Sequence, residues 1–147
     1  MTVARHPARR IVALVATTAC LVAVAPAPAE AARPREERFA AMVDEVRLTA
    51  GKSSMTLTDR LSKVARRHSR RMAAANRLFH SNLSRLLGKG GGAVAENVGY
   101  AGDLPQLLRM FLNSPAHAKN LLGKWSKTGI GIVKARGRFW VTQIFRS

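Results

Sequence analysis

Two segments near the C-terminus have the pattern of paired β-strands, and they constrain the fold more than any other feature. Gly129–Val133 and Phe139–Phe145 are together rich in β-branched and aromatic residues, and the five residues between them include Gly137. Strand-like segments joined by a short connection that contains glycine predict a β-hairpin. We expect this hairpin to be the last element to join an antiparallel sheet.

Amphipathic helices are predicted before the hairpin. Apolar residues recur every three to four positions over roughly Glu36–Thr49, and again from about Thr58 to Asn76. His68 lies on the apolar face of the second segment, where a core position is expected. The opposite face is basic and carries Arg60, Lys63, Arg66, Arg67, Arg70 and Arg71. We expect this basic face to be solvated, with contact to a polyanion as the alternative.

The middle of the chain adds shorter elements. A single helical turn is predicted at Leu83–Leu87, and a buried extended segment at Ala93–Tyr100 follows a glycine-rich loop. Asp103 is expected to cap a helix over Leu104–Leu112. A short helix then follows, and the order helix, helix, strand, helix, short helix, hairpin is typical of an α+β domain with helices on a small antiparallel sheet.

The short helix carries a histidine in its first turn. Ser114 is a suitable N-cap, Pro115 a suitable first helical residue, and Gly123 a plausible stop after about two turns. A helix this short depends on tertiary contacts. The positive end of the helix dipole disfavours the cationic form of His117.

The N-terminus has the organisation of a secretory precursor. Three arginines precede Ile11–Ala25, an apolar segment of 15 residues, and Ala29–Glu30–Ala31 fits a signal-peptidase site. Residues 1–31 are therefore predicted to be a signal peptide, residues 32–38 a short leader, and residues 39–147 a single domain. The expected location is outside the cell or in the cell envelope, with no stable membrane span after processing.

Alternatives for the N-terminus remain open. They are an uncleaved anchor, and cleavage after Ala27 or Ala29. Cys20 is the only cysteine and lies inside the apolar segment. Its lipidation is disfavoured because Thr17 stands where a lipobox requires leucine. The processed chain would then contain neither a disulfide nor a thiolate metal site.

The charge of the chain restricts its partners. The sequence has 25 Lys and Arg against 8 Asp and Glu, a net charge of +17, and removing residues 1–31 leaves +15. A field of this sign attracts polyanions. For an exported protein these are anionic envelope lipids or wall polymers, and other proteins are a further candidate. Nucleic acid is disfavoured because no recognition motif is present, and an arginine-rich composition without a binding role is the simplest alternative.

One acidic residue is not explained by local structure. Past Asp59 the only acids are Glu96 and Asp103, and only Asp103 has a capping role. Glu96 lies in an apolar segment, where a buried carboxylate requires partners such as His80, His117, backbone N–H groups or an arginine. These three residues are compatible with a divalent cation such as zinc held by the two imidazoles, and equally with a hydrogen-bonded structural cluster. The sequence contains no H-E-x-x-H, G-x-S-x-G or P-loop motif.

Four segments together resemble the CAP superfamily, also called SCP/PR-1-like domains, and most of all its small secreted bacterial members. They are LSKVARRHSRRMAAANRLFH, AENVGY, FLNSPAHAKNLL and TGIGIVKARGRFWVTQIF, in the order typical of the family. The resemblance covers roughly residues 39–145. It implies a three-layer α-β-α sandwich with a small antiparallel sheet and a C-terminal β-hairpin.

The resemblance also implies a cleft in which two histidines and two acids meet. His80, Glu96 and His117 match three of these positions, while Ser114 stands where eukaryotic members carry the second acid. Members of the family are described as binding sterols, lipids, glycans, divalent cations or proteins, and few have claimed hydrolase activity. No catalytic residue is therefore assigned here.

Three hypotheses follow for the function. The first is an exported, non-enzymatic binding module with His80, Glu96, His117 and Ser114 in its cleft, and the missing second acid favours it. The second is a metal-assisted hydrolase in which His80 and His117 bind the metal and Glu96 is the base. In the third, the His/Glu cluster is purely structural.

Overall fold

A computed structural model describes residues 33–87 and 92–147. The helices are α1 (Arg33–Thr49), α2 (Asp59–Ala75), α3 (Ser84–Leu87), α4 (Leu104–Leu112) and α5 (Pro115–Leu121). The strands are β1 (Thr56–Leu57), β2 (Val94–Ala101), β3 (Lys127–Ala135) and β4 (Arg138–Arg146). The predictions made for residues 1–31, including the signal peptide and Cys20, lie outside the described residues.

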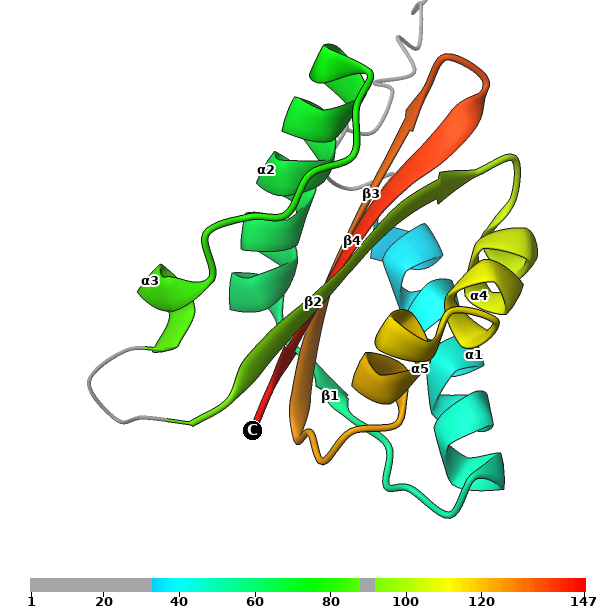
Figure 1. Ribbon diagram of the computed structural model, residues 1–147, viewed down its shortest axis with the longest axis vertical. Coiled ribbons are helices and arrows are strands. Elements are labelled where there is room, and N and C mark those ends of the chain that lie inside the picture. Colours follow the sequence, from blue (N-terminus) through cyan, green and yellow to red (C-terminus); the bar gives the residue numbers. More distant parts are fainter. Residues whose placement is uncertain (1–32, 88–91) are drawn as a thin grey trace, which may run out of the picture.

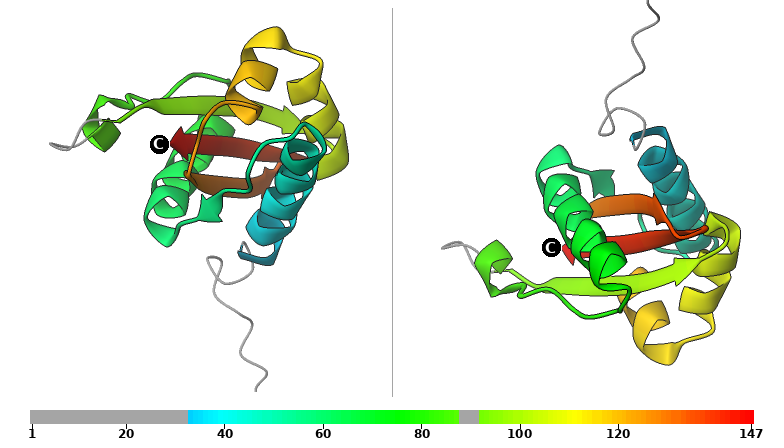
Figure 2. Two further views of the ribbon diagram at one scale, coloured as in Figure 1. Left: turned by 90° about the horizontal axis from the view of Figure 1, so that it is seen from below. Right: turned by 90° about the horizontal axis from the view of Figure 1, so that it is seen from above.

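Helices cover both faces of one four-stranded sheet. The strand order is β1-β3-β4-β2, in which β3–β4 and β4–β2 are antiparallel and β1–β3 is parallel. Figure 1 shows α2 and α3 on one side of the sheet and α1, α4 and α5 on the other. In Figure 2, α4 and α5 lie near β2 and α1 lies near β3, in agreement with their contacts. The predicted α+β fold and three-layer sandwich are confirmed.

The C-terminal hairpin is confirmed and is longer than expected. Its strands extend to Ala135 and from Arg138, so only Arg136 and Gly137 form the turn. Both residues have positive φ angles, 53° and 73°. A two-residue turn of this kind matches the right-handed twist of the strands that it connects.

Two local predictions are wrong. Helix α1 begins at Arg33, so it includes most of the segment that was expected to be a leader. The reason is Glu36, which is buried and accepts a hydrogen bond from Arg66 Nη1 at 2.5 Å and one from Ile132 N at 3.4 Å. These bonds hold the first turn of α1 on the rest of the domain. Strand β1 was not predicted, because it has only two residues directly before the second helix, and its parallel pairing with β3 makes the sheet mixed.

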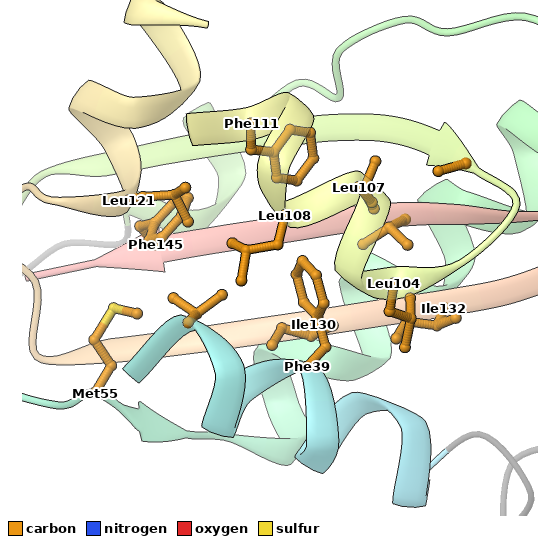
Figure 3. Packing of buried hydrophobic residues seen from close by; sticks show 13 residues of the cluster. Phe39, Met55, Leu104, Leu107, Leu108, Phe111, Leu121, Ile130, Ile132 and Phe145 are labelled. Atoms are coloured by element: carbon orange, nitrogen blue, oxygen red, sulfur yellow. The ribbon is translucent and has the colours of Figure 1, made fainter. Parts of the chain in front are cut away.

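The main hydrophobic core fills the space between the sheet and α1, α4 and α5 (Figure 3). Its largest fully buried side chains include Phe39, Phe111, Leu107, Leu121, Ile130 and Phe145. A smaller apolar layer separates the sheet from α2, and its buried members include Met72, Trp140, Leu61 and Ile144. Within the described residues, no helix is both long and apolar enough to span a lipid bilayer.

Helix α2 approaches β3 more closely than side chains would normally permit. Gly129 and Gly131 face the helix, and a Cβ atom built on Gly131 would lie 2.1 Å from the backbone nitrogen of Arg66 and 2.2 Å from the carbonyl carbon of Ala65. A Cβ atom on Gly129 would lie 2.3 Å from the carbonyl carbon of Leu61. Only glycine at these two positions allows the helix backbone to rest on the strand backbone.

Two serines of α2 form hydrogen bonds to the strands across this short distance. Ser62 Oγ accepts a hydrogen bond from the backbone N–H of Ile130 at 3.1 Å. Ser69 Oγ donates to the backbone oxygen of Gly131 at 2.8 Å and lies 2.9 Å from the hydroxyl of Thr142. The strands thus provide hydrogen-bond partners for these buried serines, and the bonds fix α2 in its position along the sheet.

Substitution of Gly131 by alanine tests this contact. Because backbone atoms of α2 would have to move away from the added methyl group, we expect Gly131→Ala to lower the free energy of unfolding by about 3 kcal/mol. Denaturant unfolding followed by circular dichroism measures the change. Gly102→Ala is the matched control, since its Cβ would meet only Gln106 Oε1 at 3.6 Å, and an equal loss in both variants would contradict the explanation.

Candidate functional site

The Glu96 carboxylate is the centre of a small buried network. Glu96 lies on β2, at the edge of the sheet, and its side chain is 1% exposed. Its Oε1 accepts hydrogen bonds from His80 Nδ1 and from the backbone N–H of Ser81, both at 2.9 Å. Its Oε2 accepts a third, from Ser81 Oγ at 2.5 Å. Three donors to one carboxylate offset much of the cost of burying its charge.

His80 has a second ring nitrogen, Nε2, that does not contact Glu96. An ionised carboxylate only accepts, so Nδ1 of His80 carries the proton in this hydrogen bond. The side chain of His80 is nevertheless 65% exposed. Its Nε2 is therefore the atom available to a ligand.

The end of α2 brings His80 and Ser81 to the sheet. The helix is followed by the C-cap residue Asn76, whose φ of 47° is left-handed, and the chain then turns back along it (Figure 1). The ring of His68 is buried and lies 2.7 Å from the backbone oxygen of Phe79 through Nε2. Arg71 Nη2 donates to His68 Nδ1 at 3.0 Å, so Nε2 must be the protonated nitrogen that donates to Phe79. The predicted core position of His68 is confirmed, and this residue positions the segment that includes His80.

His117 reaches β2 from the other face of the sheet. It is half-buried, its ring centroid lies 4.8 Å from that of Phe111, and its backbone oxygen accepts a hydrogen bond from Asn97 Nδ2 at 3.1 Å. Burial, and secondly the nearby charge of His80, lower the pKa of His117 below its usual value of 6.5. Its Nδ1 atom is buried without a hydrogen-bond partner among the described residues. Burial and the neighbouring His80 therefore disfavour the cationic form of His117.

Amide side chains attach α5 to β2 beside these histidines. Asn120 Nδ2 donates to Asn97 Oδ1 at 2.9 Å and to the backbone oxygen of Glu96 at 3.3 Å. Trp125 Nε1 in turn donates to the backbone oxygen of Asn120 at 2.7 Å. Sequence reasoning missed Asn97 and Asn120, which lie one position after Glu96 and three positions after His117, and it also missed Ser81, one position after His80.

Ser114 occupies the N-cap position of α5, as predicted, but its hydroxyl makes no capping hydrogen bond. The backbone oxygen of Ser114 accepts the first intrahelical hydrogen bond, from the N–H of Ala118 at 2.8 Å. The expected capping bond of the side chain is therefore absent, in contrast to Asp103, whose Oδ1 accepts the N–H of Gln106 at 2.6 Å.

The donor set fits a metal ion only in part. His80 has the carboxylate partner on Nδ1 that metal-binding histidines normally have, whereas the Nδ1 of His117 has none. In residues 33–87 and 92–147, no three His, Cys, Asp or Glu side chains are grouped to hold a metal ion. Two imidazoles at most are available, fewer than the three protein ligands typical of a catalytic zinc site.

A family model decides the classification of the chain. The model of the cysteine-rich secretory protein family, CAP, matches residues 40–145. The chain belongs to this family. A comparison with curated proteins gives no match.

Solved structures of CAP domains have the same fold. An outer surface protein of Borrelia burgdorferi matches with a TM-score of 0.67 and 17% identity, over 76% of this chain and 90% of that one. An extracellular SCP-domain protein of Bacillus anthracis matches with a TM-score of 0.68 and 22% identity, over 84% of this chain and 45% of that one. A cysteine-rich secretory protein of Staphylococcus aureus matches with a TM-score of 0.65 and 25% identity, over 81% of this chain and 40% of that one. The CAP domain described here thus spans less than half of the last two chains.

The pKa of His117 tests how the two histidines are arranged. We expect a titration by nuclear magnetic resonance to give a value below 6.5, and we expect His80→Gln to raise it only part of the way, because burial is the larger cause. The unfolded chain takes up this proton at higher pH than the folded one, so folding stability decreases as the pH falls from 6.5 through the folded-state pKa. Urea unfolding between about pH 8 and pH 5 should show this loss, and it should be smaller in His117→Gln. A pKa at or above 6.5 would contradict the arrangement.

Proposed function

We propose that this CAP domain is an exported, non-enzymatic binding module for anionic envelope lipid or wall polymer. The observation that supports the proposal is a set of exposed α2 cations that have no carboxylate partner among the described residues. Arg60, Lys63, Arg67 and Arg70 are exposed on this helix, and within the described part of the chain no carboxylate pairs with them. A surface with this excess of positive charge attracts polyanions.

Both acids that follow α2 are engaged in hydrogen bonds, Glu96 inside the fold and Asp103 at the surface. Glu96 is bonded to His80 and Ser81, and Asp103 caps α4. Neither carboxylate is therefore available to neutralise the basic surface. The positive field of the domain is consequently directed at solvent and at external ligands.

The same geometry argues against Glu96 as a catalytic base. A general base must reach the proton that it removes, directly or through one water molecule. The Glu96 side chain is 1% exposed, and both of its oxygens already accept hydrogen bonds. A metal-assisted hydrolase with this base is thus less well supported than a binding module.

The expected location agrees with a ligand in the envelope. The sequence predicts a secretory signal peptide, and the similar proteins include an outer surface protein and an extracellular protein. We therefore place the proposed ligand among the anionic lipids and polymers outside the membrane.

Salt dependence tests the electrostatic part of the proposal. We expect the purified protein to bind phosphatidylglycerol vesicles or isolated anionic wall polymer, and not phosphatidylcholine vesicles. Co-sedimentation should show affinity decreasing at least about tenfold between about 50 mM and about 200 mM salt, because binding releases condensed counterions. Affinity that does not change over this range would contradict it.

A divalent cation is a second candidate ligand. The exposed Nε2 of His80, whose Nδ1 is bonded to Glu96, is the observation in its favour. Calorimetric titration with zinc should give a heat of binding that is lost in His80→Ala. The absence of heat with the unsubstituted protein would eliminate this candidate.

The structural hypothesis has its own consequence. Glu96→Ala leaves the partly buried hydroxyl and N–H of Ser81 without their acceptor, so we expect a stability loss of about 1–3 kcal/mol. Thermal and urea unfolding measure it. If this variant retained full binding of both anionic ligand and zinc, the cluster would be assigned a structural role alone.

A further inference from the structure

A groove of about 1000 Å³ runs along the outer side of α2. After α2 the chain turns back beside the helix to α3, as Figure 1 shows, and the groove lies between the two. Five cationic side chains of α2 line it, namely Arg60, Lys63, Arg67, Arg70 and Arg71. The segment that turns back contributes Ser81, Asn82 and Leu86.

The five cations form a row along one face of the helix. Their spacing of three, four, three and one residues keeps them on the same side of α2. From Arg60 to Arg71 the helix rises about 16 Å, at about 1.5 Å per residue. Arg71 also donates to His68, so its position is fixed. A linear ligand with repeated negative charges would meet several of these cations in succession.

The remaining lining restricts the ligand further. Val64 and Leu86 pack with the same apolar cluster and form an aliphatic part of the groove. No aromatic side chain belongs to the described lining, whereas proteins that bind single-stranded nucleic acid stack its bases on aromatic rings. The groove is concave, so a flat membrane surface would not reach along it. Arginine matches the geometry of phosphate oxygens, and short aliphatic linkers match Val64 and Leu86.

We propose that this groove binds a linear phosphodiester polymer of the cell envelope, with successive phosphates on the α2 cations and its aliphatic units on Val64 and Leu86. This inference rests on the proposed function, because it requires a binding module for anionic ligands. It assigns the ligand to the outer side of α2 and not to the His117 face of the sheet. Ser81 connects the groove with Glu96, since its side chain lines the groove and also donates to that carboxylate.

Charge-matched variants test the location. Arg60→Gln/Arg67→Gln/Arg70→Gln removes three cations from the groove, and Arg109→Gln/Lys119→Gln/Lys124→Gln removes three exposed cations from the α4 and α5 region. With poly(glycerol phosphate) as the probe, we expect the groove variant to lose at least about tenfold in affinity and the control at most about threefold. The slope of log affinity against log salt should also decrease by about one per phosphate contact removed.

A neutral variant tests the shape of the groove. Val64→Phe fills part of the groove without changing the charge, and unfolding measurements show whether it folds normally. We expect it to weaken binding of poly(glycerol phosphate) several-fold. Unchanged affinity in a folded Val64→Phe protein would show that the groove is not used, and would overturn the proposal.

Other polyanions test which class of anionic ligand the protein binds most tightly. We expect weaker binding of phosphatidylglycerol vesicles, oligothymidylate and polygalacturonate than of poly(glycerol phosphate) at equal charge concentration. Tighter binding of any of these three would overturn the assignment of the ligand. If the unsubstituted protein bound no polyanion, the proposed function itself would fail, whereas equal losses in the groove and control variants would remove only the groove assignment.

Discussion

The backbone contact between α2 and β3 determines how this domain presents its charge. At Gly129 and Gly131 the helix lies so close to the strand that a single methyl group would collide with its backbone. The small side chains of Ser62, Ala65 and Ser69 lie at this close contact, while the larger Leu61 and Met72 pack against the sheet beside it. Long cationic side chains have no room on this face, so they are confined to the solvent side. Arg66 is the partial exception, because it lies beside the sheet and pairs with the buried Glu36.

The candidate site depends on a different constraint, the position of β2 at the edge of the sheet. Successive side chains of a strand point to opposite faces, so Glu96 and Asn97 engage different layers. Glu96 binds the segment that follows α2, through His80 and Ser81, and Asn97 binds α5, through His117 and Asn120. The two histidines are thus brought to one strand from opposite sides. This arrangement explains why His80 affects the pKa of His117 although no side-chain hydrogen bond is observed between them in the described residues.

Periodicity predicted the elements that depend on local sequence, and it failed for the elements that depend on tertiary contacts. The hairpin, α4 and the buried side of α2 follow from alternating or helical patterns, and the partners of Glu96 followed from the cost of burying a carboxylate. The start of α1 did not follow from periodicity, because it depends on a salt bridge between Glu36 and Arg66, 30 positions later in the chain. Strand β1 has only two residues and exists through its pairing with β3. That His117 comes to β2 from α5 and not from the α2 side of the sheet was also not predictable, since spacing along the chain does not specify on which face of a strand a later helix packs.

The chemistry of the site follows from which polar atoms remain available. Both oxygens of Glu96 are occupied and shielded from solvent, and the Nδ1 of His117 is buried without a partner. The sequence resemblance matches Ser114 to the second acid of some relatives, and the Ser114 hydroxyl makes no capping hydrogen bond to its own helix. An acid–base centre needs an accessible proton acceptor, and His80 Nε2 is the available candidate among these groups. On the other side of Ser81, by contrast, a row of unneutralised arginines borders a groove. This distribution of available polar groups supports the proposed binding of an extended anion beside α2.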